Sequence, residues 1–268
     1  MPNDELLDFA LQLARAAEEQ ILPHYQKCSV SLKADGSEVT EADRNAEAAV
    51  RKLIEAQYPE HEILGEEYGG ERRVAPQQWI IDPIDGTTWF TFGMPVFGTL
   101  IAYLEEGEPV IGVIHFPVIG ETVYARKGGG CWFKARNDEP MQVRVAEPVT
   151  LDQAIISASG VHGSDIVCED DGTAWPILEV IRAARKFRSC TDCLQYALVS
   201  RGSIHAGMDT RMQPWDLAAL IPCVREAGGI VSTLFGDREN IVFGGSIIAS
   251  CCEELHGQLL EKLNPSTA

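Results

Sequence analysis

The chain has 268 residues, of which 45% are hydrophobic and 23% charged, a balance typical of a globular protein and not of a disordered one. Acidic residues number 40 and basic residues 22, so the formal net charge is −18. A field of that sign repels nucleic acid and anionic lipid and favours metal cations, so we expect neither a nucleic-acid polymer nor a membrane as a partner.

The N-terminal stretch MPNDELLDFALQLARAAEEQ predicts an amphipathic helix over residues 5–22, ended by Pro23. Charged residues interrupt the pattern, so it lacks the basic start and continuous apolar core of a signal peptide. The sequence contains no run of about eighteen apolar residues, so no membrane span is expected. These features favour a cytoplasmic protein.

The first half combines a capped helix with a series of strands. Thr40 and Asp43 have the spacing of the N-cap and N3 residues of a capping box, and the helix behind them ends before Pro59. Strands are expected at EILGEE, WIID, FGTLIAYL, PVIGVIHF and ETVYA, separated by Gly, Pro and acidic turns. Residues 1–145 are therefore predicted to form an α+β half with an antiparallel or mixed sheet that carries most of the metal ligands.

After about residue 146 the pattern changes toward α/β. Strands are expected at AIISAS, SIHAGM, IVSTL and SIIAS, and helices near 174–184, in DCLQYALVSRG, in DLAALIPCVREAGG and over 253–263. No internal repeat or flexible linker separates the two parts. We expect residues 1–145 and 146–268 to share one core and to pack as layers.

Carboxylates stand at four chain breaks, namely Asp43, Glu66–Glu67, Asp82 with Asp85, and Asp216. Each has a local explanation, because Asp43 and Asp216 are placed to cap helices and the glutamate pair could be a solvated turn. If they converge, each close pair repels by roughly 4 kcal/mol at an effective dielectric constant of about 20. Protonation or a bound cation relieves that repulsion, and an all-oxygen cluster selects a hard ion such as Mg²⁺. The constellation predicts a metal site.

The residues behind the aspartate pair indicate what the metal serves. Gly86 lets the backbone approach a ligand closely, and the amides of Gly86 and Thr87 are placed to open a helix. The start of a helix presents unpaired N–H groups to an anion. The pattern Asp-x-x-Asp-Gly-Thr therefore offers cation sites beside an oxyanion cradle, as hydrolysis of a phosphate ester requires.

The stretch WIIDPIDGTTWF at 79–90, with GEE at 65–67 and PWDLAAL at 214–220, resembles the inositol monophosphatase superfamily of magnesium-dependent phosphatases. The stretch from Lys33 to Asp43, with Asp35, Ser37 and Thr40, and EAGGIVS at 226–232 extend the likeness nearly from end to end. The resemblance implies a layered αβαβα sandwich that is commonly dimeric. It also implies hydrolysis of a small phosphate monoester by metal-activated water, without a phosphoenzyme.

By position, the resemblance assigns Glu66, Asp82 and the backbone carbonyl of Ile84 to a first Mg²⁺ ion. It assigns Asp82, Asp85 and Asp216 to a second. No metal-ligand position departs from the pattern of the superfamily, which disfavours an inactive homologue or a phosphoester-sensing binding protein on the same scaffold.

The resemblance also implies the catalytic groups. Glu67 is implied to help bind a further, weaker ion, so that two or three Mg²⁺ ions occupy the active site. Thr87, paired with Asp43, is implied to orient and deprotonate the attacking water. The amides of Gly86 and Thr87 are implied to receive the phosphate. Asp43 would then both cap its helix and act in catalysis.

The sequence features that indicate the substrate are less specific than those that indicate the metal site. Trp89 stands in GTTWF where inositol phosphatases commonly read GTTNF, and the stretches 95–121, 192–202 and 218–229 look more like the histidinol-phosphatase branch. Asp209, seven residues before Asp216, falls where inositol phosphatases place a glutamate that binds substrate hydroxyls. A shorter acid there could instead meet the ammonium of an amino alcohol, or be an ordinary loop acid. Gly86, Thr87, Asp209 and Asp216 are the expected substrate contacts.

Histidinol phosphate is therefore the favoured substrate. The alternative activity is that of an inositol-1-monophosphatase. A 3′,5′-bisphosphate nucleotidase and a fructose-1,6-bisphosphatase of the same superfamily are further alternatives.

Other signals receive structural interpretations. Cys190 and Cys193 have the CxxC spacing, but no second CxxC and no paired histidines complete a zinc site, so reduced structural thiols are expected. His115 is expected to be a hydrogen-bonded strand residue, and GGG at 128–130 a flexible turn. Trp89 and Phe92, with Phe90, are expected to wall the substrate mouth, to pack in the core or to form a dimer contact.

Overall fold

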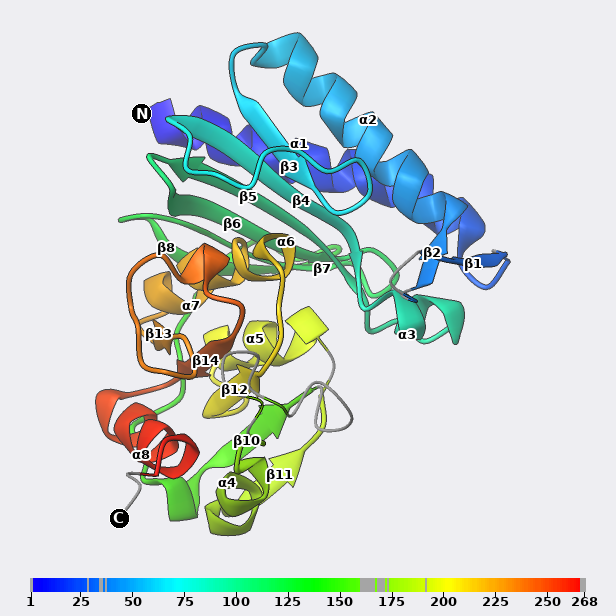
Figure 1. Ribbon diagram of the computed structural model, residues 1–268. Coiled ribbons are helices and arrows are strands. Elements are labelled where there is room, and N and C mark those ends of the chain that lie inside the picture. The colour runs from blue at the N-terminus through cyan, green and yellow to red at the C-terminus, as the bar shows by residue number, and fades with distance from the viewer. Residues whose placement is uncertain are drawn as a thin grey trace.

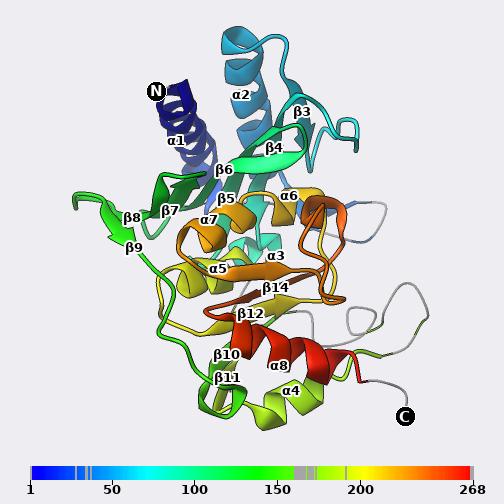
Figure 2. The same cartoon turned by 90° about the vertical axis from the view of Figure 1, so that its left-hand side faces the viewer.

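The computed structural model describes residues 2–27, 29–33, 36, 38–159, 167, 172, 174–190 and 192–265. Two β-sheets lie between three helical layers (Figure 1), and the same layering is visible after a quarter turn (Figure 2). This arrangement confirms the predicted αβαβα sandwich. Asp35 and Ser37, which were part of the motif between Lys33 and Asp43, lie outside the described residues.

Helices α1 (Pro2–Ile21) and α2 (Glu41–Gln57) cover the outer face of the larger sheet and contact its strands β4, β5 and β6. Their apolar faces pack on that sheet, with Leu13 and Val50 fully buried. Pro23 lies in the 3-10 turn Leu22–His24 directly after α1, as predicted, because proline cannot continue the hydrogen-bond ladder of the helix.

The larger sheet has seven strands in chain order: β3 (Glu62–Gly65), β4 (Gln77–Asp85), β5 (Gly98–Glu105), β6 (Glu108–Phe116), β7 (Glu121–Arg126), β8 (Gly130–Ala135) and β9 (Met141–Val143). Strand β3 runs parallel to β4 and the other pairs are antiparallel, so of the two predicted alternatives, antiparallel or mixed, the sheet is mixed. Strands β1 (Val30–Leu32) and β2 (Glu38–Thr40) form a separate antiparallel ribbon.

Strands β8 and β9 were not predicted. The glycines at 128–130 close the β7–β8 hairpin, and Gly130 is already the first residue of β8. Strand β9 forms the edge of the sheet with β8 beside it, and both are largely half-buried or exposed. The sequence of β8, GCWFKA, does not alternate strictly between apolar and polar residues, and the three residues of β9 are too few for such a pattern to be recognised.

The second sheet has five strands in the order β11 (Lys186–Arg188), β10 (Ile155–Ala158), β12 (Ala206–Asp209), β14 (Ile247–Ser250) and β13 (Ile230–Ser232). Helices α5 (Asp192–Ser200) and α7 (Leu220–Glu226) fill the layer between the sheets, whereas α4 (Ile177–Ala183) and α8 (Glu253–Leu263) cover the far face. The predicted helix DLAALIPCVREAGG is in fact two, because α6 (Pro214–Leu217) ends before α7 begins.

One buried cluster crosses the boundary at residue 145. It joins Leu100 and Ile114 of the larger sheet to Tyr196 and Leu220 of the middle helical layer. On that contact we propose that residues 1–145 and 146–268 form one compact unit.

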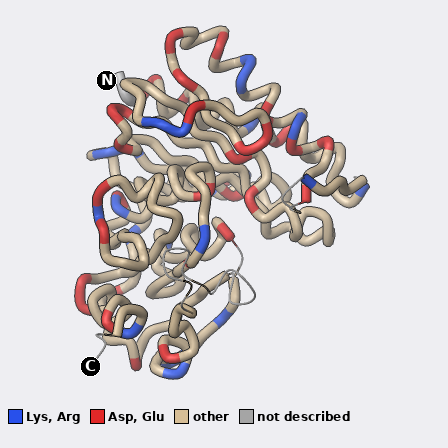
Figure 3. The backbone as a smooth tube through the Cα atoms, viewed as in Figure 1, with Lys and Arg blue, Asp and Glu red and all other residues tan. Residues whose placement is uncertain are grey.

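None of the helices in the described part of the chain combines the length and apolar character needed to cross a bilayer. Lys and Arg positions are scattered among the acidic ones along the described chain instead of forming one cluster (Figure 3).

His256 on α8 is fully buried, with Nε2 2.8 Å from Ser232 Oγ and Nδ1 2.9 Å from Ser250 Oγ. Burial lowers the pKa of His256 to about 4. The unfolded chain takes up this proton at its ordinary pKa of about 6.5 and the folded one only near 4. The stability that the neutral imidazole allows is therefore fully present above pH 6.5 and is lost as the pH falls toward 4.

We expect His256→Asn to remove this acid sensitivity, which amounts to about 3 kcal/mol at most. Urea unfolding of wild type and variant between pH 4 and 8 measures it, and the difference between their free energies of unfolding should shrink as the pH falls. His24→Asn, at a half-buried position, is the matched control. A difference that does not change with pH would contradict the role given to His256.

Candidate metal centre

Strand β4 carries Asp82 and Asp85 on the same face. The sequence predicted that this strand ends at Asp82, but it continues through Pro83 to Asp85. Side chains alternate along a regular strand, so residues three apart normally face opposite sides. The pairing of β4 with β5 shifts register between Asp82 and Asp85, where proline has no N–H to donate. This irregularity brings both carboxylates to one side.

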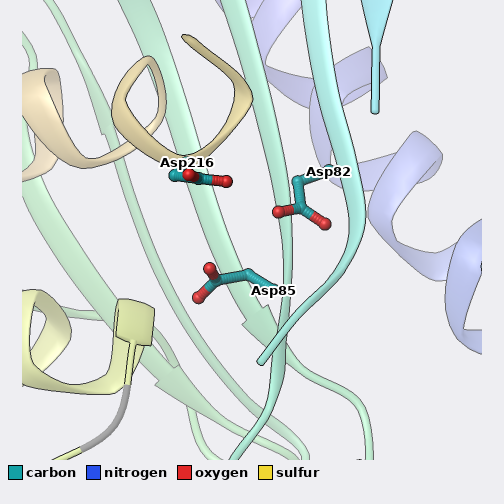
Figure 4. A group of neighbouring side chains, drawn as sticks. All are labelled: Asp82, Asp85 and Asp216. Atoms are coloured by element: carbon teal, nitrogen blue, oxygen red, sulfur yellow. The ribbon is translucent and has the colours of Figure 1, made fainter. Parts of the chain in front are cut away.

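Asp216 comes from α6, on the opposite side of the site. It occupies the N3 position of that helix, and its Oδ2 accepts a hydrogen bond at 2.7 Å from the backbone N–H of the N-cap residue Gln213. The capping box uses one carboxylate oxygen. Asp216 therefore has a local role at the helix start and still presents its carboxylate to β4 (Figure 4).

The three aspartates converge, as predicted (Figure 4). Asp82, Asp85 and Asp216 each offer a carboxylate oxygen to a group in which these atoms all lie within 4.8 Å of one another. Asp82 is 2% and Asp85 8% exposed, and Asp216 is half-buried. The acids therefore share one buried space.

That proximity disfavours their ionised forms. Burial raises the pKa of Asp82 well above its usual value, and repulsion from Glu66, Asp85 and Asp216 raises it further. The pKa of Asp85 is also raised well above its usual value, by burial and then by repulsion from Asp192 and Asp216. Burial raises the pKa of Asp216 to about 7.

A divalent cation fits this group. The donors are all oxygens, and a cation between them would replace mutual repulsion by attraction. Such donor sets suit hard ions, and Mg²⁺ in particular binds through few carboxylates together with water and substrate phosphate. The chemistry of Asp82, Asp85 and Asp216 therefore matches the predicted Mg²⁺ site.

Glu66 adjoins the aspartates, and Glu67 lies beside it. The carboxyl of Glu66 is hydrogen-bonded to that of Asp82, and its backbone N–H donates to Ile81 O at 3.2 Å. Lys33 Nζ lies 2.7 Å from Glu66 Oε1 and 2.6 Å from Glu67 Oε1. Burial raises the pKa of Glu67 to about 7.

Asp43 and Thr87 meet at the other end of the site. The capping box predicted for Asp43 is present, because Asp43 Oδ2 accepts hydrogen bonds from the backbone N–H and the hydroxyl of Thr40, at 2.8 and 2.6 Å. Thr87 Oγ1 lies 3.4 Å from Asp43 Oδ1 and 3.0 Å from the carbonyl oxygen of Ile84. Burial raises the pKa of Asp43. Asp43 thus contacts Thr87 while capping α2.

Gly86 is the N-cap of the short helix α3 (Thr87–Thr91), so the predicted helix start is confirmed. Its φ of +86° lies in the left-handed region that favours glycine. A Cβ atom at this position would lie 2.9 Å from a carboxylate oxygen of Asp192. The left-handed backbone therefore favours glycine, and a larger residue would also require the Asp192 side chain to shift.

A cavity of about 270 Å³ opens beside the aspartate group. Asp85 and Asp216 line it, together with Asp192 and Asp209. Asp209 is 7% exposed and its Oδ2 accepts hydrogen bonds from Gln195 and Tyr196, which hold the carboxylate in place, while burial raises its pKa to about 7. The predicted substrate contact Asp209 therefore lies at the same cavity as the metal centre.

Asp192 was missed by the sequence analysis. It is the first described residue of α5, has a left-handed φ of 38°, and its carboxylate is hydrogen-bonded to the side chain of Trp89. Burial raises its pKa to about 6. The residue looks like an ordinary acid at a helix start inside the CxxC spacing. Its proximity to Gly86 depends on the packing of α5 between the sheets, which no local pattern reveals.

The structure gives the cysteine motif a structural part in the site. The described cysteines are free thiols, as expected, and the backbone N–H of Cys193 donates to Asp85 Oδ2 at 2.6 Å.

His115 is hydrogen-bonded on both ring nitrogens, to Glu18 at 2.9 Å and to Thr122 at 2.8 Å. This confirms the prediction that His115 is a hydrogen-bonded strand residue.

The three aromatic residues after the aspartate pair have different surroundings. Phe90 is fully buried and packs against Phe97 with ring centroids 5.0 Å apart, so it belongs to the core. Trp89 is half-buried, and its side chain is hydrogen-bonded to Asp192, which lines the cavity. Phe92 is 68% exposed beside Trp89.

Comparison with known proteins agrees with this geometry. The sequence profile of the inositol monophosphatase family matches residues 2–268. A histidinol-phosphatase of Mycobacterium tuberculosis is 34% identical over 266 residues, which cover 98% of this chain and 99% of that protein. A fructose-1,6-bisphosphatase/inositol-1-monophosphatase of Thermotoga maritima is 31% identical over 265 residues, 96% and 98% of the two chains.

Among solved structures, an inositol monophosphatase from Zymomonas mobilis matches with a TM-score of 0.84 at 29% identity, over 98% of this chain and 99% of that one. The family match spans the residues that form the sandwich, and the buried aspartate group supplies the donor set for a metal ion. The chain therefore belongs to the inositol monophosphatase family and is a metal-dependent phosphomonoesterase.

Proposed function

We propose that the enzyme hydrolyses histidinol phosphate with two or three Mg²⁺ ions. The observation that carries the reaction class is the buried convergence of Asp82, Asp85 and Asp216. In this proposal Glu66, Asp82 and the carbonyl of Ile84 hold one ion, and the three aspartates hold another. Bound Mg²⁺ would supply Lewis-acid activation of the phosphoryl group and of water.

Glu67, Thr87 and Asp43 complete the proposed machinery. Glu67 helps to hold a further ion beside Glu66. Thr87 Oγ1 orients the attacking water and takes its proton as its own hydroxyl proton passes toward Asp43 Oδ1, 3.4 Å away. The raised pKa of Asp43 suits a group that must accept a proton.

The start of α3 receives the phosphate in this proposal. The first N–H groups of a helix have no intrahelical partner, and the amides of Gly86 and Thr87 occupy that place.

The acids of the cavity support a cationic leaving group. Beyond the metal ligands the cavity is lined by two acids, Asp192 and Asp209, and by one cation, Arg211, so acids are in excess in a cavity that must admit a phosphate anion. An ammonium on the leaving group would offset that charge, whereas a neutral polyol would not. The name of the relative from Mycobacterium tuberculosis, a histidinol-phosphatase, supports the same choice. Inositol 1-phosphate is the second candidate, because the relative from Thermotoga maritima carries that activity in its name at 31% identity.

A panel of phosphate esters compared by kcat/KM tests the proposal. It includes histidinol phosphate, inositol 1-phosphate, a nucleoside 3′,5′-bisphosphate and fructose 1,6-bisphosphate. We expect a preference for histidinol phosphate of more than about tenfold, which corresponds to about 1.4 kcal/mol. A smaller preference would remove the substrate assignment, and turnover that persists in excess EDTA would remove the metal mechanism.

Replacing Asp192 by asparagine is expected to lower kcat/KM for histidinol phosphate by about 10–100-fold, the size of a lost charge-assisted hydrogen bond. Asparagine tolerates the left-handed backbone, so the local fold should be kept. Activity on inositol 1-phosphate should change by less than about threefold, and Asp138→Asn, in an exposed turn, is the control. An equal loss on both substrates would show that Asp192 only supports the structure.

We also propose that the protein is a cytoplasmic homodimer. Free thiols at the described cysteines suit a reducing compartment. The dimer is proposed because members of this superfamily are commonly dimeric. Sedimentation equilibrium should give twice the mass of one chain, and the mass of a single chain would exclude it.

A further inference from the structure

Glu47 lies on α2, one turn after Asp43, and is 0% exposed. Its Oε2 accepts a hydrogen bond from the backbone N–H of Glu67 at 2.7 Å, and its Oε1 accepts one from that of Tyr68 at 3.2 Å. Arg51, one turn further along α2, donates Nε–H to Glu47 Oε1 at 2.7 Å and a second N–H to the carbonyl oxygen of Gly69. The two side chains hold the backbone of residues 67–69 from the α2 side.

The contact is too close to be incidental. A Cβ atom on Gly65 would lie 2.0 Å from Glu47 Oε1, so only glycine fits at the end of β3. A buried carboxylate is costly unless it is paired and hydrogen-bonded. Glu47 meets that requirement because it accepts hydrogen bonds from two backbone N–H groups of the segment that follows β3 and from the guanidinium of Arg51.

The same segment points its acids the other way. Glu66 is hydrogen-bonded to Asp82, and both Glu66 and Glu67 contact Lys33. Gly65 N–H donates to Gly69 O at 3.0 Å within the segment, and Glu66 N–H donates to Ile81 O of β4 at 3.2 Å. The backbone N–H groups of the next two residues, Glu67 and Tyr68, are held by Glu47.

We propose that Glu47, with Arg51, is a positioning residue that aims Glu66 and Glu67 at the metal centre and so sets the affinity for Mg²⁺. The proposal rests on the metal ligands assigned under the proposed function. Partners that orient the ligands of a metal typically change metal affinity or activity by about 10–100-fold when they are removed. Glu47 touches no reacting atom, so its effect falls on the binding of Mg²⁺ and little on turnover once Mg²⁺ saturates.

The test compares Glu47→Gln with wild type in Mg²⁺ binding measured by calorimetry and by Mg²⁺-dependent thermal melts. Glutamine keeps the volume but loses the charge and one acceptor. We expect the Kd for Mg²⁺ to rise about 10–100-fold, and kcat at saturating Mg²⁺ to change less than about threefold. Hydrogen exchange at the amides of Glu67 and Tyr68 should accelerate. Glu55→Gln, exposed on the same helix, is the control and should match wild type.

Arg51→Lys covers the case in which Glu47→Gln does not fold. Lysine keeps the charge but cannot reach Glu47 and the carbonyl of Gly69 together, so a smaller rise in the same Kd is expected. An unchanged Kd with only a lower thermal midpoint would overturn the proposal and leave Glu47 as an anchor of α2. If wild type itself shows no Mg²⁺-dependent thermal shift or turnover, the metal centre of the proposed function is wrong, and the positioning role of Glu47 is wrong with it.

Discussion

Replacing Asp82 by asparagine is expected to lower kcat/KM by about a thousandfold or more and to raise the thermal midpoint of the metal-free enzyme. Asp82 lies next to Glu66, Asp85 and Asp216, and in the proposed assignment it is the carboxylate shared between two ions. Loss of such a ligand removes several kcal/mol of transition-state stabilisation. The gain in stability arises because Asp82 is buried among other acids that repel its charge.

The sign of the stability effect follows from the raised pKa of Asp82. The folded chain holds this proton more tightly than the unfolded chain, so the metal-free protein loses stability as the pH rises above the ordinary aspartate pKa of about 3.9. Asparagine cannot ionise and escapes that loss. Melts at neutral pH with and without Mg²⁺ measure it, with Asp138→Asn as the control. A variant that is merely slower and keeps the full Mg²⁺-induced shift would contradict a shared ligand.

Replacing Thr87 by valine is expected to lower kcat by about 100–10,000-fold, the range typical of a lost proton-transfer group. Valine keeps the shape of threonine but lacks the hydroxyl that lies between Ile84 O and Asp43 Oδ1. The amide of residue 87 stays in place, so KM and Mg²⁺ affinity should change little.

Steady-state kinetics at saturating Mg²⁺ measure this effect. Thr88→Val is the matched control, because Thr88 is the exposed neighbour on the same short helix. Asp43→Asn in the Thr87→Val background should cause little further loss, since the proposed mechanism places the two groups in one proton path. A kcat within threefold of wild type for Thr87→Val would remove Thr87 from the proposed mechanism.

Features set by neighbouring residues were predictable from the sequence. The capping box of Thr40 and Asp43, the helix start at Gly86 and the terminal helix over 253–263 depend on spacings of a few residues, and all are present. The convergence of Asp82, Asp85 and Asp216 was also predicted, because the resemblance to the inositol monophosphatase superfamily assigns these three residues to one metal ion.

Features set by packing were not predictable in this way. The continuation of β4 through Pro83 depends on an irregular pairing with β5, and proline argues against a strand locally. Asp192 reaches the cavity only because α5 packs between the sheets. Glu47 did leave a signal: it shares the face of α2 that buries Asp43, Ala46 and Val50. A charged residue on an apolar helix face indicates a buried partner.

The central claim is that Asp82, Asp85 and Asp216 hold the catalytic metal. Anomalous diffraction from crystals soaked in Mn²⁺, which prefers the same oxygen ligands, tests it most directly. We expect anomalous peaks bound by carboxylate oxygens of these three residues. Peaks found only elsewhere, with the three aspartates unbound in a catalytically active protein, would contradict it.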